Sequence, residues 1–406
     1  MTSEPTTAFV WIWLTGATEP VVCGRIDNDG GRISFTYARS FRERPDAVPV
    51  YGPELPLQAG PQFAASGLRL PLCLDDGLPD AWGRRLVNHR LGASTGEFSE
   101  LTYLLESGSD RFGALDFQAS ATVYRARYTD HPSLDDLAPA ARRIEAGEPL
   151  NDMLEAALLH GTSIGGARPK ALLTDDGRHL IAKFTSSTDP FPVIQGEYLA
   201  MELARRVGLH VAPVALARAA GRHALLVERF DRDQAGHRRR AVSAFTMLGL
   251  TTFPEGRYAT YVDLAHKIRE LCIKPDATLR ELYARISFNI LCGNTDDHGR
   301  NHACLIDPAG LTLSPAYDIC PQARTGREAR QAMAFTADGG RTARVADLVA
   351  AAAIYHLDAT DAQAIVDHQA TVIRDGWDEE CDAAELTASQ RAAFMHRQFL
   401  NPGAFD

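Results

Sequence analysis

One polar loop, set between a helix pattern and a hairpin pattern, constrains the fold of this chain most strongly. Apolar residues spaced four apart from 282 to 290 predict a helix that buries one face. Residues 294–301, Asn-Thr-Asp-Asp-His-Gly-Arg-Asn, follow directly. Two short strand patterns, 302–306 and 311–314, then flank an Asp-Pro-Ala-Gly turn. A helix, a loop and a hairpin are therefore expected in that order.

Three side chains around this loop suit the transfer of a phosphoryl group. Asp296 follows the predicted helix closely and could orient the proton of an attacking hydroxyl group. Asn301 and Asp318, before and after the hairpin, supply hard oxygen atoms of the kind that Mg²⁺ binds. An Asp-to-Asn spacing like this one also arises by chance, in loops whose Asp and Asn only cap turns. The helix, the hairpin and the second Asp favour a catalytic loop.

A metal-dependent hydrolase is an alternative interpretation of the same stretch. Side chains that bind zinc or paired metal ions gather there, at Asp296, Asp297, His298, His302 and Cys304. Their spacing fits no helical H-x-x-x-H pattern, so the phosphotransferase interpretation is preferred.

A glycine-rich segment nearer the N-terminus is the candidate phosphate loop. Residues 163–170 read Ser-Ile-Gly-Gly-Ala-Arg-Pro-Lys, and the small residues Gly165, Gly166 and Ala167 would let backbone N–H groups approach phosphates. No Gly-Lys-Ser/Thr sequence follows, so the segment is not a Walker-type P-loop. A simple turn is the alternative.

Two predicted strand ends could complete a nucleotide site. Lys183 closes an apolar strand pattern, and a lysine there needs a negative partner such as a phosphate unless it reaches solvent. Glu197, on the next helix pattern, could pair with it. Residues 228–232, Glu-Arg-Phe-Asp-Arg, end another strand, where backbone groups could read adenine beside Phe230. A plain charged strand end is the alternative.

The periodicity divides the chain into β-rich and helical stretches and predicts the α+β class. A length of 406 residues suggests two or three domains or lobes. The expected strands lie at 9–14, 20–26, 32–37, 172–173, 180–184, 212–217 and 224–227, and helices are expected from about 80, from about 140, at 193–207 and over most of the chain beyond 240.

Charge and cysteine content narrow the function classes. The formal net charge is −10, which argues against a protein that binds DNA by itself. The run Arg238-Arg239-Arg240 is interpreted as a solvated loop, with contact to DNA or an acidic partner as the alternative. Seven scattered cysteines suit a reduced compartment. The first residues resemble a strand more than a signal peptide, and no apolar stretch reaches about 20 residues, so a cytoplasmic location without membrane contact is expected.

With these parts in order, the chain resembles the HipA family of bacterial toxin–antitoxin serine/threonine kinases over nearly its full length. The motifs that carry the resemblance are D-D-G-L-P-D-A-W-G-R at 75–84, G-S-D-R-F-G-A-L at 108–115, S-x-x-G-A-x-x-K at 163–170, V-E-R-F-D-R at 227–232, N-x-D-x-H-x-R-N at 294–301 and Tyr317-Asp318. Arg300 stands where the family often has Lys, and Arg168-Pro169 replaces a Gln-Glu-like pair.

The resemblance implies a two-lobed kinase-like fold with three parts. These are an N-terminal coupling domain at 1–125, a β-rich nucleotide lobe at 126–238 and a helical lobe at 239–406. Asp296 would be the catalytic base, Asn301 and Asp318 would bind Mg²⁺, and Ser163 would be the autophosphorylated residue whose phosphate switches the kinase off. The implied ATP site consists of Gly165, Gly166, Ala167, Arg168, Lys170, Lys183, Glu228, Arg229, Phe230, His298, Arg300, Asn301, Tyr317 and Asp318.

The resemblance also implies partners. A HipB-like helix-turn-helix antitoxin would bind the protein and carry any contact with DNA, and the substrate would be a protein such as an aminoacyl-tRNA synthetase. Two alternatives remain open. One is a small-molecule kinase of the aminoglycoside phosphotransferase type, which shares the Asp-to-Asn spacing, and the other is a catalytically silent corepressor that binds an antitoxin.

Overall fold

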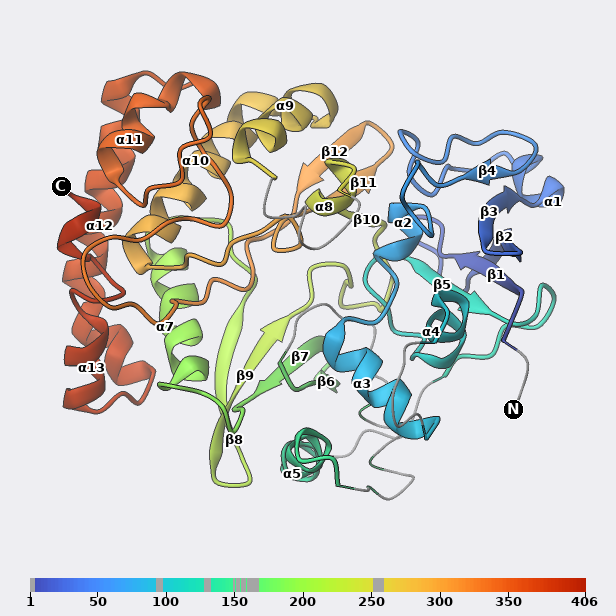
Figure 1. The fold of residues 1–406 in the computed structure, drawn as a ribbon, viewed down its shortest axis with the longest axis horizontal. Coiled ribbons are helices and arrows are strands. Elements are labelled where there is room, and N and C mark those ends of the chain that lie inside the picture. Colours follow the sequence, from blue (N-terminus) through green and yellow to red (C-terminus); the bar gives the residue numbers. More distant parts are fainter. Residues whose placement is uncertain are drawn as a thin grey trace. The chain divides into compact units, whose positions relative to one another are not determined.

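The chain forms two compact units of mixed helix and sheet (Figure 1). The computed structural model describes residues 4–92, 98–127, 133–148, 150, 154, 158, 168–250 and 259–406. The first unit comprises residues 1–186, 218–222 and 228–242, and the second comprises residues 187–217, 223–227 and 243–406. The domain boundaries expected near residues 126 and 239 remain predictions.

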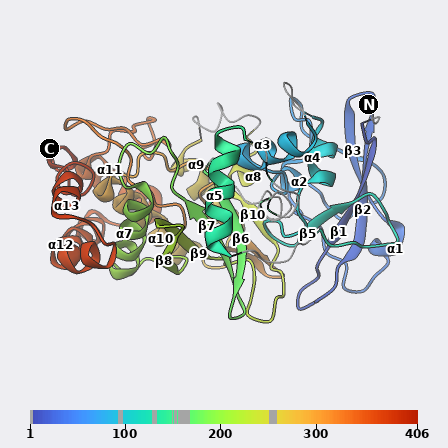
Figure 2. The same ribbon diagram turned by 90° about the horizontal axis from the view of Figure 1, so that it is seen from below.

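The first unit begins with an antiparallel five-stranded sheet, whose order is β4-β3-β2-β1-β5 (Figure 2). Alternate residues of β3 are buried, as expected for a sheet with one face in the core. The three N-terminal strands thus confirm the sequence prediction to within a few residues. The strands are β1 Thr7–Ile12, β2 Val21–Asp29, β3 Arg32–Tyr37, β4 Gln62–Phe63 and β5 Leu115–Gln118.

The first unit also contains five described helices. The carboxylate of Asp80 accepts a hydrogen bond from the backbone N–H of Gly83 at 2.7 Å and so caps α3. The apolar side chains of Trp82, Leu86 and Val87 on α3 are fully buried. The helices are α1 Arg39–Arg42, α2 Leu72–Asp75, α3 Ala81–Arg90, α4 Glu100–Glu106 and α5 Leu134–Glu145.

The helix expected to begin near residue 140 instead ends at Glu145. Ser133 and Asp136 form a capping box that starts α5 six residues earlier than predicted. Pro139 lies inside α5, past the first turn, where it removes the hydrogen bond that an N–H would donate to the Asp135 carbonyl. The prediction was wrong because the capping residues were not recognised.

A tight hairpin completes the first unit. Strands β6, Lys170–Asp175, and β7, Arg178–Phe184, pair antiparallel. Asp176 and Gly177 both have positive φ, 47° and 75°, as in the two-residue turn of a β-hairpin. Strands β8 Val214–Ala219, β9 Arg222–Glu228 and β10 Ala241–Ser243 contain residues of both units.

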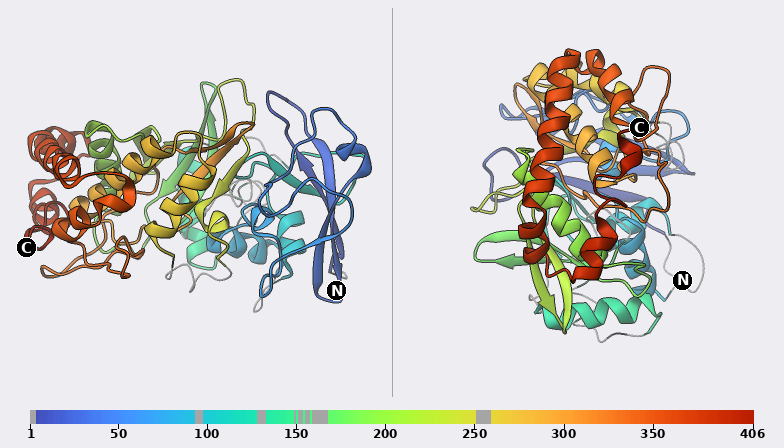
Figure 3. Two further views of the ribbon diagram at one scale, coloured as in Figure 1. Left: turned by 90° about the horizontal axis from the view of Figure 1, so that it is seen from above. Right: turned by 90° about the vertical axis from the view of Figure 1, so that its left-hand side faces the viewer.

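The second unit is mainly helical, as predicted. Its longest described helix, α12, packs against α7 and α10 (Figures 1 and 3). In the described part of the chain, no helix is both long and apolar enough to span a membrane. The helices are α7 Val193–Arg206, α8 Ala244–Met247, α9 Tyr261–Leu271, α10 Pro275–Cys292, α11 Val345–Ala350, α12 Ala359–Ala383 and α13 Ala388–Phe394, with 3-10 helices at Ala352–Tyr355 and Pro402–Ala404.

The predicted helix–loop–hairpin sequence lies within this unit. The apolar face of α10 is completely buried, and strands β11, Ala303–Asp307, and β12, Gly310–Leu313, pair antiparallel after the loop. Gly293 ends α10 with a φ of 73°. A Cβ atom built on Gly293 would lie 2.7 Å from the carbonyl oxygen of Gln398, and the Leu400 N–H donates to the Leu291 carbonyl at 2.7 Å. The segment around residues 398–400 therefore packs tightly against the start of the loop.

Candidate active site

The loop between α10 and β11 is anchored by the buried carboxylate of Asp297. It accepts hydrogen bonds from Asn289 Nδ2 at 2.9 Å, from His302 Nε2 at 2.8 Å and from the hydroxyl of Tyr261. Asn294 Nδ2 donates to Asn289 Oδ1 at 3.0 Å and extends this network. Burial alone would raise the pKa of Asp297, but His302 and Tyr261 hold this pKa below its ordinary value. An ionised, buried Asp297 therefore holds the loop in place.

Asp296 has the opposite environment although it precedes Asp297 directly. The side chain of Asp296 is exposed, while that of Asp297 is 4% exposed. The loop thus presents one carboxylate outward from a backbone that its neighbour holds in place. A rigidly held, accessible carboxylate is what a residue that orients a substrate hydroxyl requires.

Helix α8 fixes the far end of the loop. The N–H groups of Phe245 and Ala244 donate to the carbonyl oxygens of Gly299 at 2.9 Å and His302 at 2.8 Å. A Cβ atom at Gly299 would lie 3.3 Å from the Phe245 backbone, so the close approach favours glycine. The guanidinium of Arg300 lies over the Phe245 ring, 4.2 Å from its centroid.

A hydrogen bond connects the loop to the segment that carries the second predicted metal ligand. The hydroxyl of Tyr317 donates to the carbonyl oxygen of Arg300 at 2.8 Å. Asn301 follows Arg300 and is buried, whereas Asp318 follows Tyr317 and is half-buried. Asp318 has a φ of 60°, a left-handed conformation that is uncommon for residues other than glycine and that concentrates at functional sites.

The donor set at this place fits magnesium rather than zinc. An amide oxygen and a carboxylate are hard oxygen donors, which suit Mg²⁺. Within residues that the structure describes, no group of three or more His, Cys, Asp or Glu side chains is arranged to hold a metal ion. The hydrolase alternative, with its Asp-His-Cys cluster, therefore has no geometric support, because Asp297 and His302 bond to each other.

The candidate phosphate loop is described only at its end. Ser163, Gly165, Gly166 and Ala167 lie outside the described residues, and the half-buried Arg168 is the first described residue of the motif.

Lys170 has a partner within the protein. Its ammonium lies 2.5 Å from the Asp80 carboxylate, and both side chains are largely buried. The indole N–H of Trp82 also donates to the Lys170 carbonyl at 3.2 Å. The Lys170 side chain, which was expected in the ATP site, is therefore held by α3.

Lys183 is the half-buried lysine directly opposite Lys170 in the β6–β7 register. Opposed residues of an antiparallel pair share a face, where two like charges are destabilising. Asp80 offsets the charge of Lys170. The pairing of Glu197, which is buried in α7, with Lys183 remains a prediction.

The predicted adenine segment has an internal role for one of its side chains. Glu228 and Phe230 are half-buried, but Arg229 is 4% exposed and its guanidinium binds Asp231 at 2.9 Å and Asp110 at 3.0 Å. The Arg229 side chain is thus occupied inside the first unit. The Arg229 N–H donates to the His179 carbonyl on β7 at 2.9 Å, which places the segment beside the hairpin.

Two residues of the Arg238-Arg239-Arg240 run contradict its interpretation as a solvated loop. Arg238 is 6% exposed, donates to the Ser109 carbonyl at 2.9 Å and lies over the Trp13 ring. Arg240 is 8% exposed and donates to the Pro49 carbonyl at 3.0 Å. Arg239 alone of the three is exposed. Aromatic and carbonyl partners make this burial possible.

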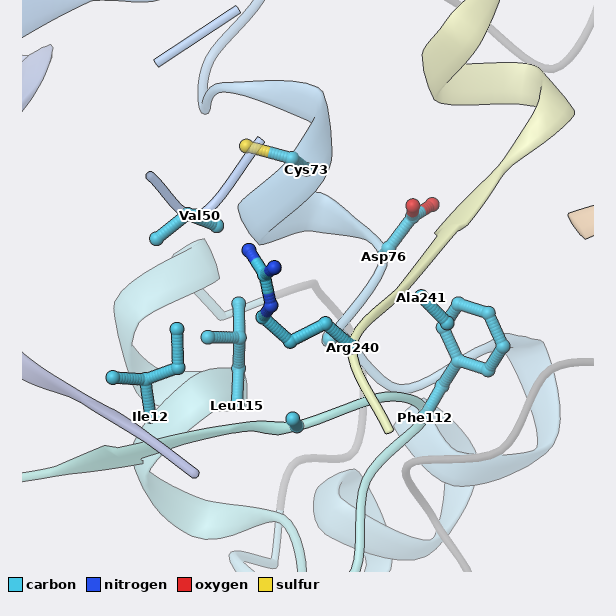
Figure 4. Close-up of a pocket in the computed structure, with 10 residues that line it drawn as sticks. Ile12, Val50, Cys73, Asp76, Phe112, Leu115, Arg240 and Ala241 are labelled. Atoms are coloured by element: carbon cyan, nitrogen blue, oxygen red, sulfur yellow. The ribbon is translucent and has the colours of Figure 1, made fainter. Parts of the chain in front are cut away.

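Arg240 also lines a narrow pocket of the first unit, shown in Figure 4. The pocket is walled by apolar side chains from several segments, such as Ile12, Val50 and Leu115. None of the predicted nucleotide residues lines it, so it is separate from the candidate active site.

Comparisons with known proteins identify the fold and the family of the chain. A solved structure described as a complex of Shewanella oneidensis HipA, HipB and operator DNA matches with a TM-score of 0.71 and 21% identity, over 95% of this chain and 97% of that one. The α+β, HipA-type fold expected from the sequence is thereby confirmed. The family model for the HipA-like C-terminal domain matches residues 162–377, more than half of the chain, and the model for the HipA N-terminal domain matches residues 14–118.

The chain therefore belongs to the HipA-like family. Among curated relatives, "Putative kinase Y4mE" of Sinorhizobium fredii is 28% identical over 76% of each chain. "Serine/threonine-protein kinase toxin HipA" of Shewanella oneidensis is 28% identical over 39% of this chain and 42% of its own length. Both names describe kinases, as the predicted loop chemistry does.

Proposed function

We propose that this protein is an ATP- and Mg²⁺-dependent serine/threonine protein kinase. One observation carries the proposal: the loop from Asp296 to Asn301 is fixed from beneath by Asp297, while Tyr317 ties it to the segment of Asp318. This rigid arrangement joins an outward carboxylate to two oxygen donors, the set that phosphoryl transfer requires.

Each residue has a defined task in the proposed reaction. Asp296 orients the substrate hydroxyl and accepts its proton while the oxygen attacks the γ-phosphorus and the bond to the β,γ-bridging oxygen breaks. Asn301 and Asp318 would hold Mg²⁺, which neutralises phosphate charge when bound. Lys183 would contact the phosphates, and the backbone of residues 228–230 would contact adenine. Arg168, His298, Arg300 and Tyr317 would line the same site, with the loop of Gly165, Gly166 and Ala167.

The regulation and partners are part of the same proposal. Phosphorylation of Ser163 would add roughly two negative charges beside the phosphate loop and so disfavour ATP binding. The matched HipA structure contains HipB and operator DNA. We therefore expect a HipB-like helix-turn-helix antitoxin as partner, with DNA reached only through it, in keeping with the net charge of −10. A protein substrate such as an aminoacyl-tRNA synthetase is expected.

Phosphopeptide mass spectrometry tests the proposal. The wild-type protein and Asp296→Asn are incubated with ATP, Mg²⁺ and a cell lysate, and Asp367→Asn, which changes an exposed carboxylate on α12, is the matched control. We expect serine or threonine phosphates, including one on Ser163, with the wild type and the control, and none with Asp296→Asn. Phosphate transfer only to an aminoglycoside or sugar would favour the small-molecule kinase, and absence of ATP binding would favour the silent corepressor.

A further inference from the structure

A buried cluster of four charged side chains joins two distant parts of the first unit. Arg229 and Arg232 lie in the segment that follows β9, while Asp110 lies in the motif that precedes β5. Asp231 is the fourth member, and none of the four side chains is more than 13% exposed. Two positive and two negative charges balance within the cluster. Burial of such ions is costly unless each is paired with good geometry.

The geometry meets that requirement. Arg229 binds Asp231 through two nitrogen atoms, Nε and Nη2, each at 2.9 Å, which is the bidentate arrangement. Arg232 Nη2 lies 2.7 Å from Asp110, and Arg232 Nη1 lies 3.1 Å from Asp231. Burial would raise the pKa of Asp231, but Arg229 and Arg232 hold this pKa below its ordinary value. The cluster is therefore ionic at neutral pH.

Backbone groups of residues 110–113 complete the connection. The Gly113 N–H donates to Asp231 at 2.7 Å, and Arg232 donates to the Gly113 carbonyl at 2.8 Å. Arg229 and Arg232 both donate to the Arg111 carbonyl, at 2.7 and 2.6 Å. The ring of Phe112 meets that of Phe230 edge to face, 6.2 Å between centroids. Every described residue from Asp110 to Gly113 thus contacts the segment that was predicted to read adenine.

We infer that Asp110 is a positioning residue for nucleotide binding, which fixes the backbone of residues 228–230 through Arg229 and Arg232. Asp110 belongs to the part matched by the HipA N-terminal domain model, whereas residues 228–232 belong to the part matched by the C-terminal model. The N-terminal domain therefore contributes to the ATP site without touching ATP. This inference rests on the proposed ATP-dependent function.

Asp116 provides a matched control because its carboxylate sits in a neighbouring buried ionic cluster. Its carboxylate binds Arg111 at 2.8 Å and Arg127 at 2.8 Å, and it bonds to none of residues 228–232 in the hydrogen bonds and ion pairs described for it. Asp116→Asn therefore disturbs the same region of the fold by the same chemical change. A general loss of stability would affect both variants, whereas misplacement of the adenine segment would affect only Asp110→Asn.

Calorimetric titration of the full-length protein with Mg²⁺-ATP and Mg²⁺-GTP tests the inference. We expect Asp110→Asn to weaken ATP binding about tenfold or more and to narrow the preference for ATP over GTP. Asp116→Asn should lose a similar amount of thermal stability and bind ATP like the wild type. Arg232→Lys keeps the positive charge but loses the planar guanidinium group that binds Asp110 and Asp231 together. It serves as the second variant if Asp110→Asn does not fold.

Two outcomes would overturn the inference, and they are distinguishable. If Asp110→Asn and Arg232→Lys bind ATP like the wild type while melting earlier, Asp110 is only a structural residue and the proposed function stands. If the folded wild-type protein binds no ATP, the proposed function fails, and no nucleotide segment remains for Asp110 to position.

Discussion

Nε2 of His302 donates a hydrogen bond of 2.8 Å to the carboxylate of Asp297, across the loop that carries Asn301. This bond closes the loop on itself between α10 and β11. Asp296 lies just before the closed segment and Asn301 lies inside it. The positions of the proposed base and of one proposed metal ligand thus depend on a pair that takes no part in the chemistry.

Substitution of Asp297 should lower the stability of the protein, whereas substitution of Asp296 should not. Asp297→Asn removes the charge to which His302, Tyr261 and Asn289 bond, and we expect it to lower the free energy of unfolding by about 3 kcal/mol. Urea unfolding measures this change. Asp296→Asn should leave stability within about 0.5 kcal/mol of the wild type because Asp296 is exposed. Equal losses in the two variants would contradict the anchoring role.

The pH dependence of stability follows from the same carboxylate. The pKa of Asp297 is lower in the folded protein than its ordinary value of 3.8, as is that of Asp231. Their contribution to stability is therefore complete above about pH 4 and is lost as the pH falls through the folded-state pKa values. In urea unfolding at decreasing pH, the difference between wild type and Asp297→Asn should shrink below about pH 4. A difference in stability that does not change with pH would mean that the Asp297 carboxylate is not the source of the stabilisation.

Two buried tyrosines differ in whether their hydroxyl groups have partners. The hydroxyl of Tyr261 bonds to Asp297, whereas that of Tyr283 on α10 has no hydrogen-bond partner within the described part of the chain. We expect Tyr261→Phe to cost about 1–3 kcal/mol, because a buried carboxylate loses a donor. Tyr283→Phe should be neutral or slightly stabilising. Thermal unfolding of the two variants measures this contrast, and a reversed order would refute the assigned bond.

The opposed lysines of the β6–β7 hairpin should respond differently to loss of charge. Lys170→Met leaves the Asp80 carboxylate buried without its ion-pair partner, and should cost about 3 kcal/mol of stability. Lys183→Met should change stability much less but lower phosphoryl transfer about 100-fold. Asp80→Asn combined with Lys170→Met should recover part of the lost stability. Steady-state kinetics and urea unfolding separate these effects, and equal kinetic losses with intact folding would contradict them.

Two glycines with positive φ provide a further comparison. Gly293→Ala combines a φ of 73° with a Cβ atom 2.7 Å from the Gln398 carbonyl oxygen, so it should cost at least about 3 kcal/mol. Gly208→Ala has a φ of 91° but open space around its Cβ atom, and should cost only about 1 kcal/mol. Melting temperatures of both variants test this order. Similar melting temperatures for the two variants would mean that the 398–400 segment can shift at little energetic cost.

Local periodicity was sufficient to predict many elements of the fold. The hairpin at Asp176-Gly177 and the helix–loop–hairpin around Asp296 follow from patterns that span a few residues. The start of α5 at Leu134, rather than near residue 140, depends on the capping box of Ser133 and Asp136. The break between α11 and the 3-10 helix at Ala352–Tyr355 does not follow from the sequence pattern, because buried apolar residues continue through it.

The partners of buried charges could not be predicted. Lys170 and Asp80 are far apart in the sequence, as are Arg229 and Asp110, so only the tertiary fold shows that they pair. Within the loop, the spacing to Asn301 singles out Asp296 in the sequence, but it does not show that the adjacent carboxylate of Asp297 is buried. Only the positions of His302 and Tyr261 distinguish the buried one from the exposed one. The residues of the candidate phosphate loop that lie outside the described part keep their status as predictions.

The contact between residues 398–400 and the end of α10 has a consequence for synthesis of the protein on the ribosome. The Leu400 N–H and the Gln398 backbone can contact the end of α10, next to the candidate catalytic loop, only after translation has passed them, more than 90 residues beyond that loop. A nascent chain that already contains Asp296, Asn301 and Asp318 thus still lacks a support of their loop.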